Sequence, residues 1–324
     1  AFEEINAAGG VLGKKIELFT EDNQTRPGES ATAAKKLVTR EKVIALIGEV
    51  ASGRALEAAP VAQAAKVPMV APAATNPKVT EIGDYIFRVC FIDPFQGTVM
   101  AKFAHEDLKV KKVAILYSVS NAYSVGLAKY FRETFAGSSG EIVAEANFSE
   151  GDKDFRAQLT AVKAAGAEAV FVPSYYTEAA LIVRQARDLG IDVPFFGGDG
   201  WEAPQLLEIG GAALDGCFYS THFSPQNQDP AVQEFVSRFK TRWDGQTPDA
   251  FAALGYDSAY VLVDAIKRAG TTEGPQLRDA LAATKKFRGV TGETTIDANR
   301  DASKPAAILA IKDGKLTFLK TVAP

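Results

Sequence analysis

Small polar residues follow several apolar runs of this sequence, at points where a ligand could reach them. Val50-Ala51-Ser52-Gly53 leads from one such run into a segment with helical spacing. The unpaired N–H groups and the dipole of a helix start favour an anion. Ser52 adds a hydroxyl, and the small side chain of Ala51 lets a ligand approach the backbone. The alternative is an ordinary serine N-cap.

A second candidate stretch, Pro72-Ala73-Ala74-Thr75, ends the next apolar run. Ligands of doubly wound sheets bind at the carboxyl ends of the strands, so we expect this stretch at the same edge as Ser52. The carbonyl of Ala73, next to the small Ala74, could accept from a cation, and the hydroxyl of Thr75 could help to hold an anion. The alternative is that residues 75–77 form only a turn.

Further candidates come from the middle of the chain. Asp199 lies in Gly198-Asp199-Gly200, a pattern that is otherwise typical of a turn. Aromatic side chains near strand ends could contact a ligand or simply pack within a lobe, and Tyr176 is expected to face away. The aromatic candidates are Tyr123, Tyr175, Trp201 and Phe251.

Patterns typical of catalysis or metal binding do not appear. There is no GxGxxG after a strand, no GxSxG, and no set of Ser, His and Asp that suggests a triad. His105 and His222 form no ligand pattern, and we expect both at the surface or at a lobe edge. Cys90 and Cys217 lack metal-ligand spacing. We therefore expect no enzyme, no metal and no cofactor.

Composition indicates a folded protein with two lobes. The 324 residues exceed what one core usually serves, and 47% are hydrophobic while 23% are charged. No run of eighteen apolar residues exists that could span a bilayer. The net charge of −4 offers no basic stripe, so we expect no nucleic-acid partner.

Short apolar runs alternate with helical segments at a spacing of about 25 residues, as in right-handed parallel crossovers. This predicts an α/β chain with doubly wound parallel sheets, because several runs are apolar on both faces. The expected strands are 15–21, 43–48, 67–71, 85–89, 113–118, 142–148, 169–173, 194–197 and 216–221. The expected helices include 28–40, 54–65, 97–108, 123–135, 154–165 and 178–189.

The pattern changes after residue 221. Three helices in a row are expected, the last at about 276–286, followed by a turn at 287–292. Alternating apolar residues on both sides of Asp313-Gly314 then predict a closing hairpin with strands 307–312 and 315–321.

Several segments, in this order, resemble the periplasmic binding proteins of type I, and among them the branched-chain amino-acid receptors of ABC transporters. They are residues 1–13 (AFEEINAAGGVLG), 47–53 (IGEVASG), 72–77 (PAATNP), 153–155 (KDF), 175–176 (YY), 184–187 (RQAR) and 197–200 (GGDG). Members of this family normally begin with a strand and a loop that precede the helix starting here at Ala1. Without that strand, two neighbours in the first sheet would lack ladder partners, so we expect the given sequence to be shortened.

The resemblance implies two lobes joined by three crossovers near 89–93, 221–225 and 296–303. Residues 1–91 and 223–297 would form lobe one, and residues 92–222 and 304–324 would form lobe two. It also implies a zwitterionic ligand with an apolar side chain, branched-chain or aromatic. Asp199 would bind the ammonium, Tyr123 and Tyr175 would contact the ligand, and closure of the lobes would be the mechanism.

The implied partners are a small-molecule amino acid and the permease subunits of an ABC transporter, for a monomer in the periplasm or outside the cell, with a lipid anchor allowed. A sensor or a receptor for amides or aromatic acids remains an alternative, and an α/β enzyme is disfavoured. Cys90 and Cys217 each precede a crossover and could approach one another, although free buried thiols are favoured.

Overall fold

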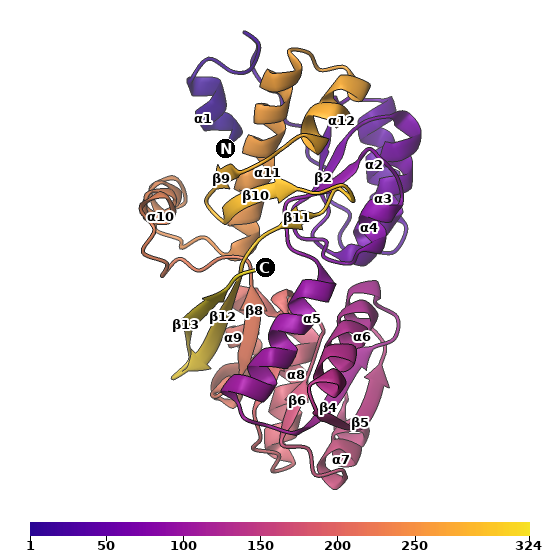
Figure 1. The fold of residues 1–324 in the computed structure, drawn as a ribbon, viewed down its shortest axis with the longest axis vertical. Coiled ribbons are helices and arrows are strands. Elements are labelled where there is room, and N and C mark those ends of the chain that lie inside the picture. The colour runs from indigo at the N-terminus through magenta and orange to yellow at the C-terminus, as the bar shows by residue number, and fades with distance from the viewer. The chain divides into compact units, whose positions relative to one another are not determined.

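The computed structural model describes residues 1–324, which divide into two compact units (Figure 1). The first unit contains Ala1–Ile92 and Pro230–Lys304, and the second contains Asp93–Asp229 and Pro305–Pro324. The chain therefore passes from one unit to the other three times, after Ile92, Asp229 and Lys304. None of the helices combines the length and apolarity needed to cross a membrane.

The first unit is built on a parallel sheet in the order β1-β2-β3, formed by Leu46–Ile47, Met69–Ala71 and Ile86–Arg88. Successive residues of these strands enter different cores, as the alternation of a strand requires. Val70 and Phe87 pack with residues of α11, whereas Met69 and Ile86 pack with residues of α3. Both faces of the sheet are therefore covered by helices.

Twelve α-helices accompany the sheets of the two units. In the first unit they are α1 (Phe2–Ala7), α2 (Glu29–Thr39), α3 (Ser52–Ala65), α4 (Lys78–Glu81), α10 (Pro230–Arg242), α11 (Ala250–Ala269) and α12 (Gly274–Ala282). In the second unit they are α5 (Asp93–Lys102), α6 (Ala122–Gly137), α7 (Arg156–Ala164), α8 (Tyr176–Asp188) and α9 (Pro204–Gly210). The expected run of three helices after residue 221 is confirmed as α10, α11 and α12.

The strand expected at 15–21 does not form. Ile16 instead exchanges hydrogen bonds with the side chain of Asn6, and no strand of the described chain pairs with residues 15–21. Beside this segment lies a cavity of about 610 Å³, lined in part by the apolar side chains of Leu18, Phe19 and Ile47. An apolar pattern cannot make a strand by itself, because the backbone also needs a ladder partner.

The turn expected at 287–292 is wrong in part, because strands flank a shorter turn. β9 (Phe287–Gly289) and β10 (Gly292–Ile296) pair as an antiparallel hairpin, and β11 (Ala302–Ser303) adds to β10. The carboxylate of Asp257 on α11 accepts hydrogen bonds from the N–H groups of Val290 and Thr291 at 2.8 and 2.9 Å. A contact from a distant helix therefore shapes this hairpin.

The second unit contains a seven-stranded sheet in the order β13-β12-β8-β7-β6-β4-β5. Its strands are β4 (Lys112–Ser118), β5 (Glu141–Phe148), β6 (Ala169–Phe171), β7 (Phe195–Gly197), β8 (Phe218–Thr221), β12 (Ala306–Lys312) and β13 (Lys315–Val322). The first five of these are parallel, whereas β12 pairs antiparallel with both β8 and β13. The predicted fold class is confirmed for both units.

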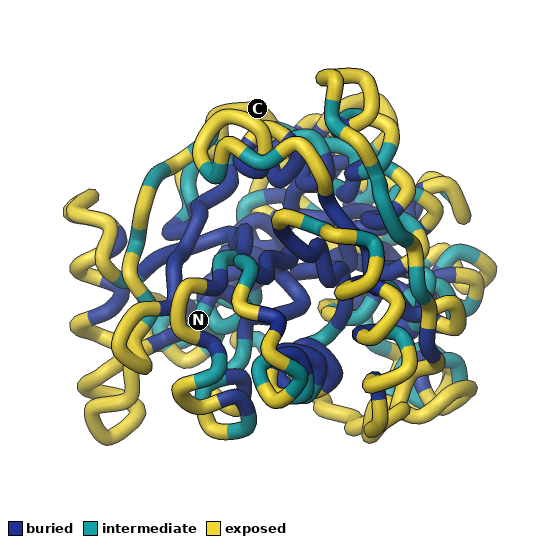
Figure 2. Tube along the Cα trace, turned by 90° about the horizontal axis from the view of Figure 1, so that it is seen from below, coloured by how far each residue is buried: buried dark blue, intermediate teal, exposed yellow.

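Helices cover both faces of this sheet as well. Val170 on β6 packs in a core with residues of α7, α8 and α9. The next residue, Phe171, faces the other way, where its ring lies 4.0 Å from that of Phe131 on α6. Figure 2 colours the chain by burial, with buried stretches in dark blue and exposed ones in yellow. Packing on both faces therefore fixes the positions of the strands and of the residues that directly follow them.

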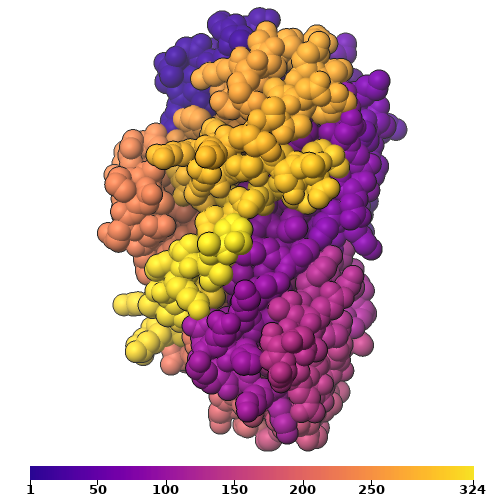
Figure 3. Space-filling view, in the orientation of Figure 1, coloured from indigo at the N-terminus to yellow at the C-terminus, as the bar shows by residue number.

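The predicted hairpin at the end of the chain is confirmed. Asp313 and Gly314 form its turn with φ of 50° and 69°. A two-residue turn with two positive φ values suits the twist of the flanking strands. β13 alternates between exposed and half-buried residues and lies at the surface, where it is yellow in Figure 3.

Candidate functional site

The start of α3 leaves backbone N–H groups available for a ligand. Ala51 is the N-cap residue, and no side chain caps the helix. Ser52 is therefore not the N-cap, so the capping-serine alternative is wrong. Its buried hydroxyl instead accepts a hydrogen bond from the N–H of Asn76 at 3.2 Å. Ser52 thus connects the helix start to the loop that follows β2.

That loop brings the second group of candidates to the same place. Ala73, Ala74 and Thr75 are all buried, and Thr75 is fully so. The Oγ1 of Thr75 has no hydrogen-bond partner within the protein. Because burying a hydroxyl without a partner is unfavourable, this atom is suited to bind a ligand group. The structure therefore joins Ser52 and the 73–75 segment in one cluster, which we call the first half-site.

Arg88, which was not among the predicted site residues, binds the backbone of this loop. Its fully buried guanidinium donates to the carbonyls of Ala74 and Asn76, among others. An arginine inside the otherwise apolar run 85–90 was the signal that could have revealed it. Such a charge can be buried only with several partners.

Phe251 belongs to the first unit as the second residue of α11. It is half-buried and packs against the core that contains Val70 and Leu254. The predicted contact of Phe251 with a ligand side chain stays a prediction.

Asp199 follows β7 in the second unit and is 3% exposed. Gln96 donates to its Oδ1 at 2.8 Å, and Nε2 of His222 lies 3.0 Å from its Oδ2. A carboxylate can only accept, so this contact requires the hydrogen on Nε2. The carboxylate is therefore held in one orientation inside the unit.

The expectation that His222 lies at the surface or an edge is wrong, because the residue is buried at the end of β8. β8 lies next to and parallel with β7 in the sheet, so His222, which directly follows β8, could have been found by asking which polar residues follow the strands. His105, by contrast, is exposed as predicted. Gln96 was missed because a lone glutamine on a helix carries no motif.

Tyr123 and Tyr175 come together beside Asp199. Their rings stack with centroids 5.3 Å apart and planes inclined by 15°. The hydroxyl of Tyr123 accepts a hydrogen bond from the N–H of Gly200 at 3.0 Å. We call Asp199, Tyr123 and Tyr175, with Gln96 and His222, the second half-site.

Glycine at position 200 permits this approach. A Cβ there would lie 2.7 Å from the carbonyl oxygen of Ser174 and 2.8 Å from the ring of Tyr123. Either contact would push the Gly198-Asp199-Gly200 segment away from the tyrosine. The pattern is therefore more than a turn, because Gly200 lets the segment that carries Asp199 approach Tyr123 closely.

Both tyrosines stay protonated at neutral pH. Burial raises the pKa of Tyr123 well above its ordinary value, and the negative charges of Asp199 and Asp93 add to this effect. Burial likewise raises the pKa of Tyr175, again with a contribution from Asp199. The second half-site therefore combines negative charge with neutral phenols, which suits a cation.

Trp201 follows Asp199 and Gly200 in the same short 3-10 helix. It is fully buried in the core of its unit, and its Nε1–H donates to the carbonyl of Val172 at 2.9 Å. Tyr176 packs against the same core. The indole N–H is thus satisfied by the protein itself, and the predicted contact of Trp201 with a ligand side chain stays a prediction.

The two cysteines are buried free thiols. Burial raises the pKa of the Cys217 thiol to about 12, although the guanidinium of Arg187 lies 4.0 Å from its sulfur and acts in the opposite direction. No group of three or more His, Cys, Asp or Glu side chains is arranged to hold a metal ion.

With two doubly wound units and a ligand-type cluster at the strand ends of each, the molecule has the design of a two-lobed solute receptor. The periplasmic binding protein family matches residues 1–315, and the chain belongs to this family.

Several individual members of the family are similar to this chain along almost its whole length. The chain is 32% identical to Leu/Ile/Val-binding protein homolog 3 of Brucella melitensis, over 99% of this chain and 86% of that protein. It is also similar to a leucine-binding protein of Thermotoga maritima, with 40% identity and a TM-score of 0.95 over 100% of this chain and 92% of the other.

A branched-chain amino acid transporter substrate-binding protein of Streptococcus pneumoniae, solved in complex with isoleucine, is 37% identical. Its TM-score is 0.94, with 100% of this chain and 92% of the other covered.

Proposed function

We propose that this protein binds a branched-chain amino acid as the extracytoplasmic receptor of an ABC importer. The observation that carries the proposal is the opposite chemistry of the two half-sites. The first offers hydrogen-bond donors at a helix start, and the second offers a buried carboxylate beside two phenols. A free amino acid carries one group for each.

The first half-site suits the α-carboxylate. The first N–H groups of α3 lack intrahelical partners, and the positive end of the helix dipole lies at the same point. The hydroxyl of Thr75 can donate to a carboxylate oxygen, which would provide the partner that this buried atom lacks. A hydrogen bond to a charged group contributes about 1.5–3 kcal/mol.

The second half-site suits the α-ammonium. The carboxyl group of Asp199 is fixed by Gln96 and His222, so little reorganisation is needed when a cation arrives. The stacked faces of Tyr123 and Tyr175 add cation–π attraction for an ammonium. That one amino acid occupies both half-sites and that the lobes close around it stays a prediction.

The relatives support the class of ligand. One is named a leucine-binding protein and another was solved with isoleucine, so a branched aliphatic side chain is the first choice for this chain as well. Delivery to permease subunits, a location outside the cytoplasm, action as a monomer and the absence of catalysis are parts of the same proposal.

Calorimetric titration and thermal shift with the purified protein test the proposal. Leucine, isoleucine and valine are compared with the other amino acids and with benzoate. At a ligand concentration of 100 times Kd, a true ligand should stabilise the fold by about 2.7 kcal/mol. A larger shift with benzoate than with any amino acid would favour a receptor for aromatic acids instead.

Two leucine analogues separate the half-sites. Leucinamide keeps the ammonium and lacks the carboxylate, whereas 4-methylpentanoate keeps the carboxylate and lacks the ammonium. Both should bind at least about tenfold more weakly than leucine, because each leaves one half-site without its charged partner. Recovery of unaltered leucine after long incubation is expected, and any product would indicate an enzyme.

A further inference from the structure

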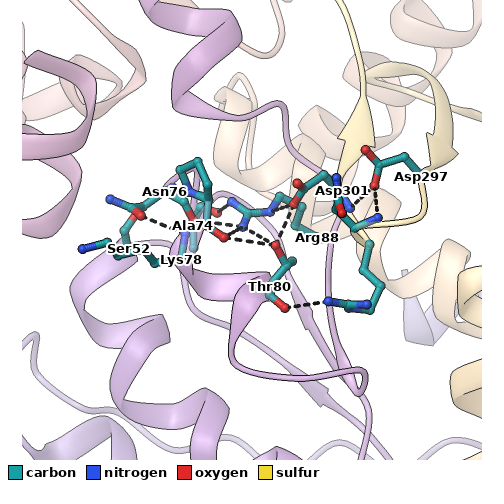
Figure 4. A network of polar contacts seen from close by, with 11 residues as sticks. Ser52, Ala74, Asn76, Lys78, Thr80, Arg88, Asp297 and Asp301 are labelled. Atoms are coloured by element: carbon teal, nitrogen blue, oxygen red, sulfur yellow. Dashed lines mark hydrogen bonds and ion pairs between the residues drawn. The ribbon is translucent and has the colours of Figure 1, made fainter. Parts of the chain in front are cut away.

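The loop that follows β2, residues 72–77, carries Thr75 and is called the ligand loop below. Arg88 binds the backbone of this loop from inside the first unit (Figure 4). Its Nη1 donates to the carbonyl of Ala74, and its Nη2 donates to the carbonyls of Asn76 at 2.9 Å and Pro77 at 3.3 Å. These carbonyls flank Thr75 on both sides. One guanidinium therefore sets the path of the backbone that carries the unpartnered hydroxyl.

The same guanidinium also binds a segment more than 200 positions later in the sequence. Its Nε lies 2.7 Å from Oδ1 of Asp301. Thr80 bridges the two, because its hydroxyl donates to Asp301 at 2.9 Å and accepts from Arg88 at 3.0 Å. The network thus links the end of the ligand loop to the turn that contains Asp301.

Hydrogen bonds within the turn, and from the turn to Thr80, fix its conformation. The carboxylate of Asp297 accepts from the N–H of Asp301 at 3.0 Å, and Arg300 donates to the carbonyl of Thr80 at 2.9 Å. The turn leads through β11 to Lys304, the last residue of the first unit before the third connection. The ion pair of Arg88 and Asp301 therefore contacts both the ligand loop and the turn that precedes this connection.

A contribution to folding stability does not by itself explain the buried ion pair of Arg88 and Asp301. A buried ion pair often contributes no more than apolar side chains of the same volume would, because both charges lose their hydration. Arg88 is fully buried and Asp301 is nearly so. Burial also raises the pKa of Asp301, with the charge of Arg88 acting in the opposite direction. What an apolar pair could not supply is the set of donors for three carbonyls.

We propose that Arg88 and Asp301 are positioning residues of the ligand site. They hold the backbone around Thr75 in the conformation that binds a carboxylate, and they couple that conformation to the turn before the third connection. The identity of the ligand in this inference rests on the proposed function, whereas the ordering of the loop does not.

The first test replaces both charges at once. In Arg88→Met/Asp301→Leu no charge is left unpaired, so the fold is expected to persist. Leucine should bind about tenfold or more weakly, and the preference for leucine over leucinamide should shrink because carboxylate recognition is what is lost. Unchanged affinity and unchanged preference in the folded variant would overturn the inference.

Milder variants keep the test decisive if the double variant does not fold. Arg88→Lys keeps the charge but cannot reach three carbonyls, and Thr80→Val removes only the bridging hydroxyl. Both should weaken leucine more than leucinamide, Thr80→Val the less of the two. Full binding by Arg88→Lys would show that charge alone suffices and would contradict a positioning role.

Arg268→Met is the matched control. Arg268 also joins a carboxylate, that of Asp264, to a backbone carbonyl, that of Ala280, within the first unit. Its loss should lower the melting temperature without changing the preference for leucine over leucinamide.

Hydrogen exchange separates this inference from the proposed function. In the absence of ligand, peptides that cover residues 72–80 should exchange faster in Arg88→Lys than in the parent, while peptides from α11 should not. If the parent binds no amino acid, the proposed function fails, but this result still decides whether Arg88 orders the loop. Equal exchange in both proteins would refute the ordering itself.

Discussion

Under the proposed function, the first half-site would offer backbone N–H groups and hydroxyls to a ligand, while the nearby charges of Arg88 and Asp301 pair with one another inside the unit. The second half-site presents a charge directly, because Asp199 is held by Gln96 and His222 beside two tyrosines. Under the proposed function, one unit would distribute its contacts with the ligand over many weak donors, whereas the other would concentrate them in one carboxylate. Single substitutions should accordingly have unequal effects in the two units.

The largest effect is expected for Asp199→Ala. Removing one partner of a buried charged pair costs about 2–5 kcal/mol, so leucine should bind about 30-fold to several thousandfold more weakly in calorimetry. Asp192→Asn, an exposed acid of the same unit, is the control and should bind normally. Parental affinity in Asp199→Ala would end the ammonium assignment.

A smaller loss of affinity is expected for Thr75→Val, combined with unchanged or higher stability of the ligand-free protein. The change keeps the shape of the side chain but removes a buried hydroxyl that has no partner in the protein. Leucine should bind about tenfold more weakly, since a hydrogen bond to a charged group is lost.

Thr294→Val is its matched control, because Thr294 is also fully buried in the first unit with an unpartnered Oγ1. The control should show the same change in stability and unaltered binding. Equal losses of binding in both variants would mean that Thr75 contributes through packing only.

The third prediction concerns alkaline pH. Burial raises the pKa of Tyr123 and Tyr175 above the value in the unfolded chain, so the stability they contribute is complete below about pH 10. As the pH rises toward the folded-state pKa, the unfolded state releases these protons first and the free energy of unfolding falls. In Tyr123→Phe/Tyr175→Phe this decline should be shallower in denaturant titrations. An identical decline would show that other groups cause it.

The smallest difference between the units is expected for the thiols, one in each. Cys217 has a pKa raised to about 12 by burial, and Cys90 is equally inaccessible. A thiol reagent at neutral pH should therefore modify neither residue in the native protein and both after denaturation. Rapid modification of one thiol in the native state would reveal local opening of that unit.

Much of the fold could be predicted from the sequence alone. The parallel strands from β1 to β8 lie within or next to the predicted ranges, because apolar runs bounded by turn residues carry their own period. The closing hairpin followed from Asp313-Gly314 in the same way. Strand ends suggested Tyr123 and Tyr175, and the family resemblance added Asp199; the structure brings the three residues together.

What the sequence by itself determined is therefore local: the period of each element, its turns, and the residues that follow each strand. Only the tertiary structure decided that residues 15–21 find no ladder partner, that Trp201 belongs to a core and that His222 turns inward to Asp199. It also decided that Thr80 bonds Asp301, which is 221 positions away. The physical reason is that a buried polar group is stable only beside its partners, and no local pattern records which distant segments supply them.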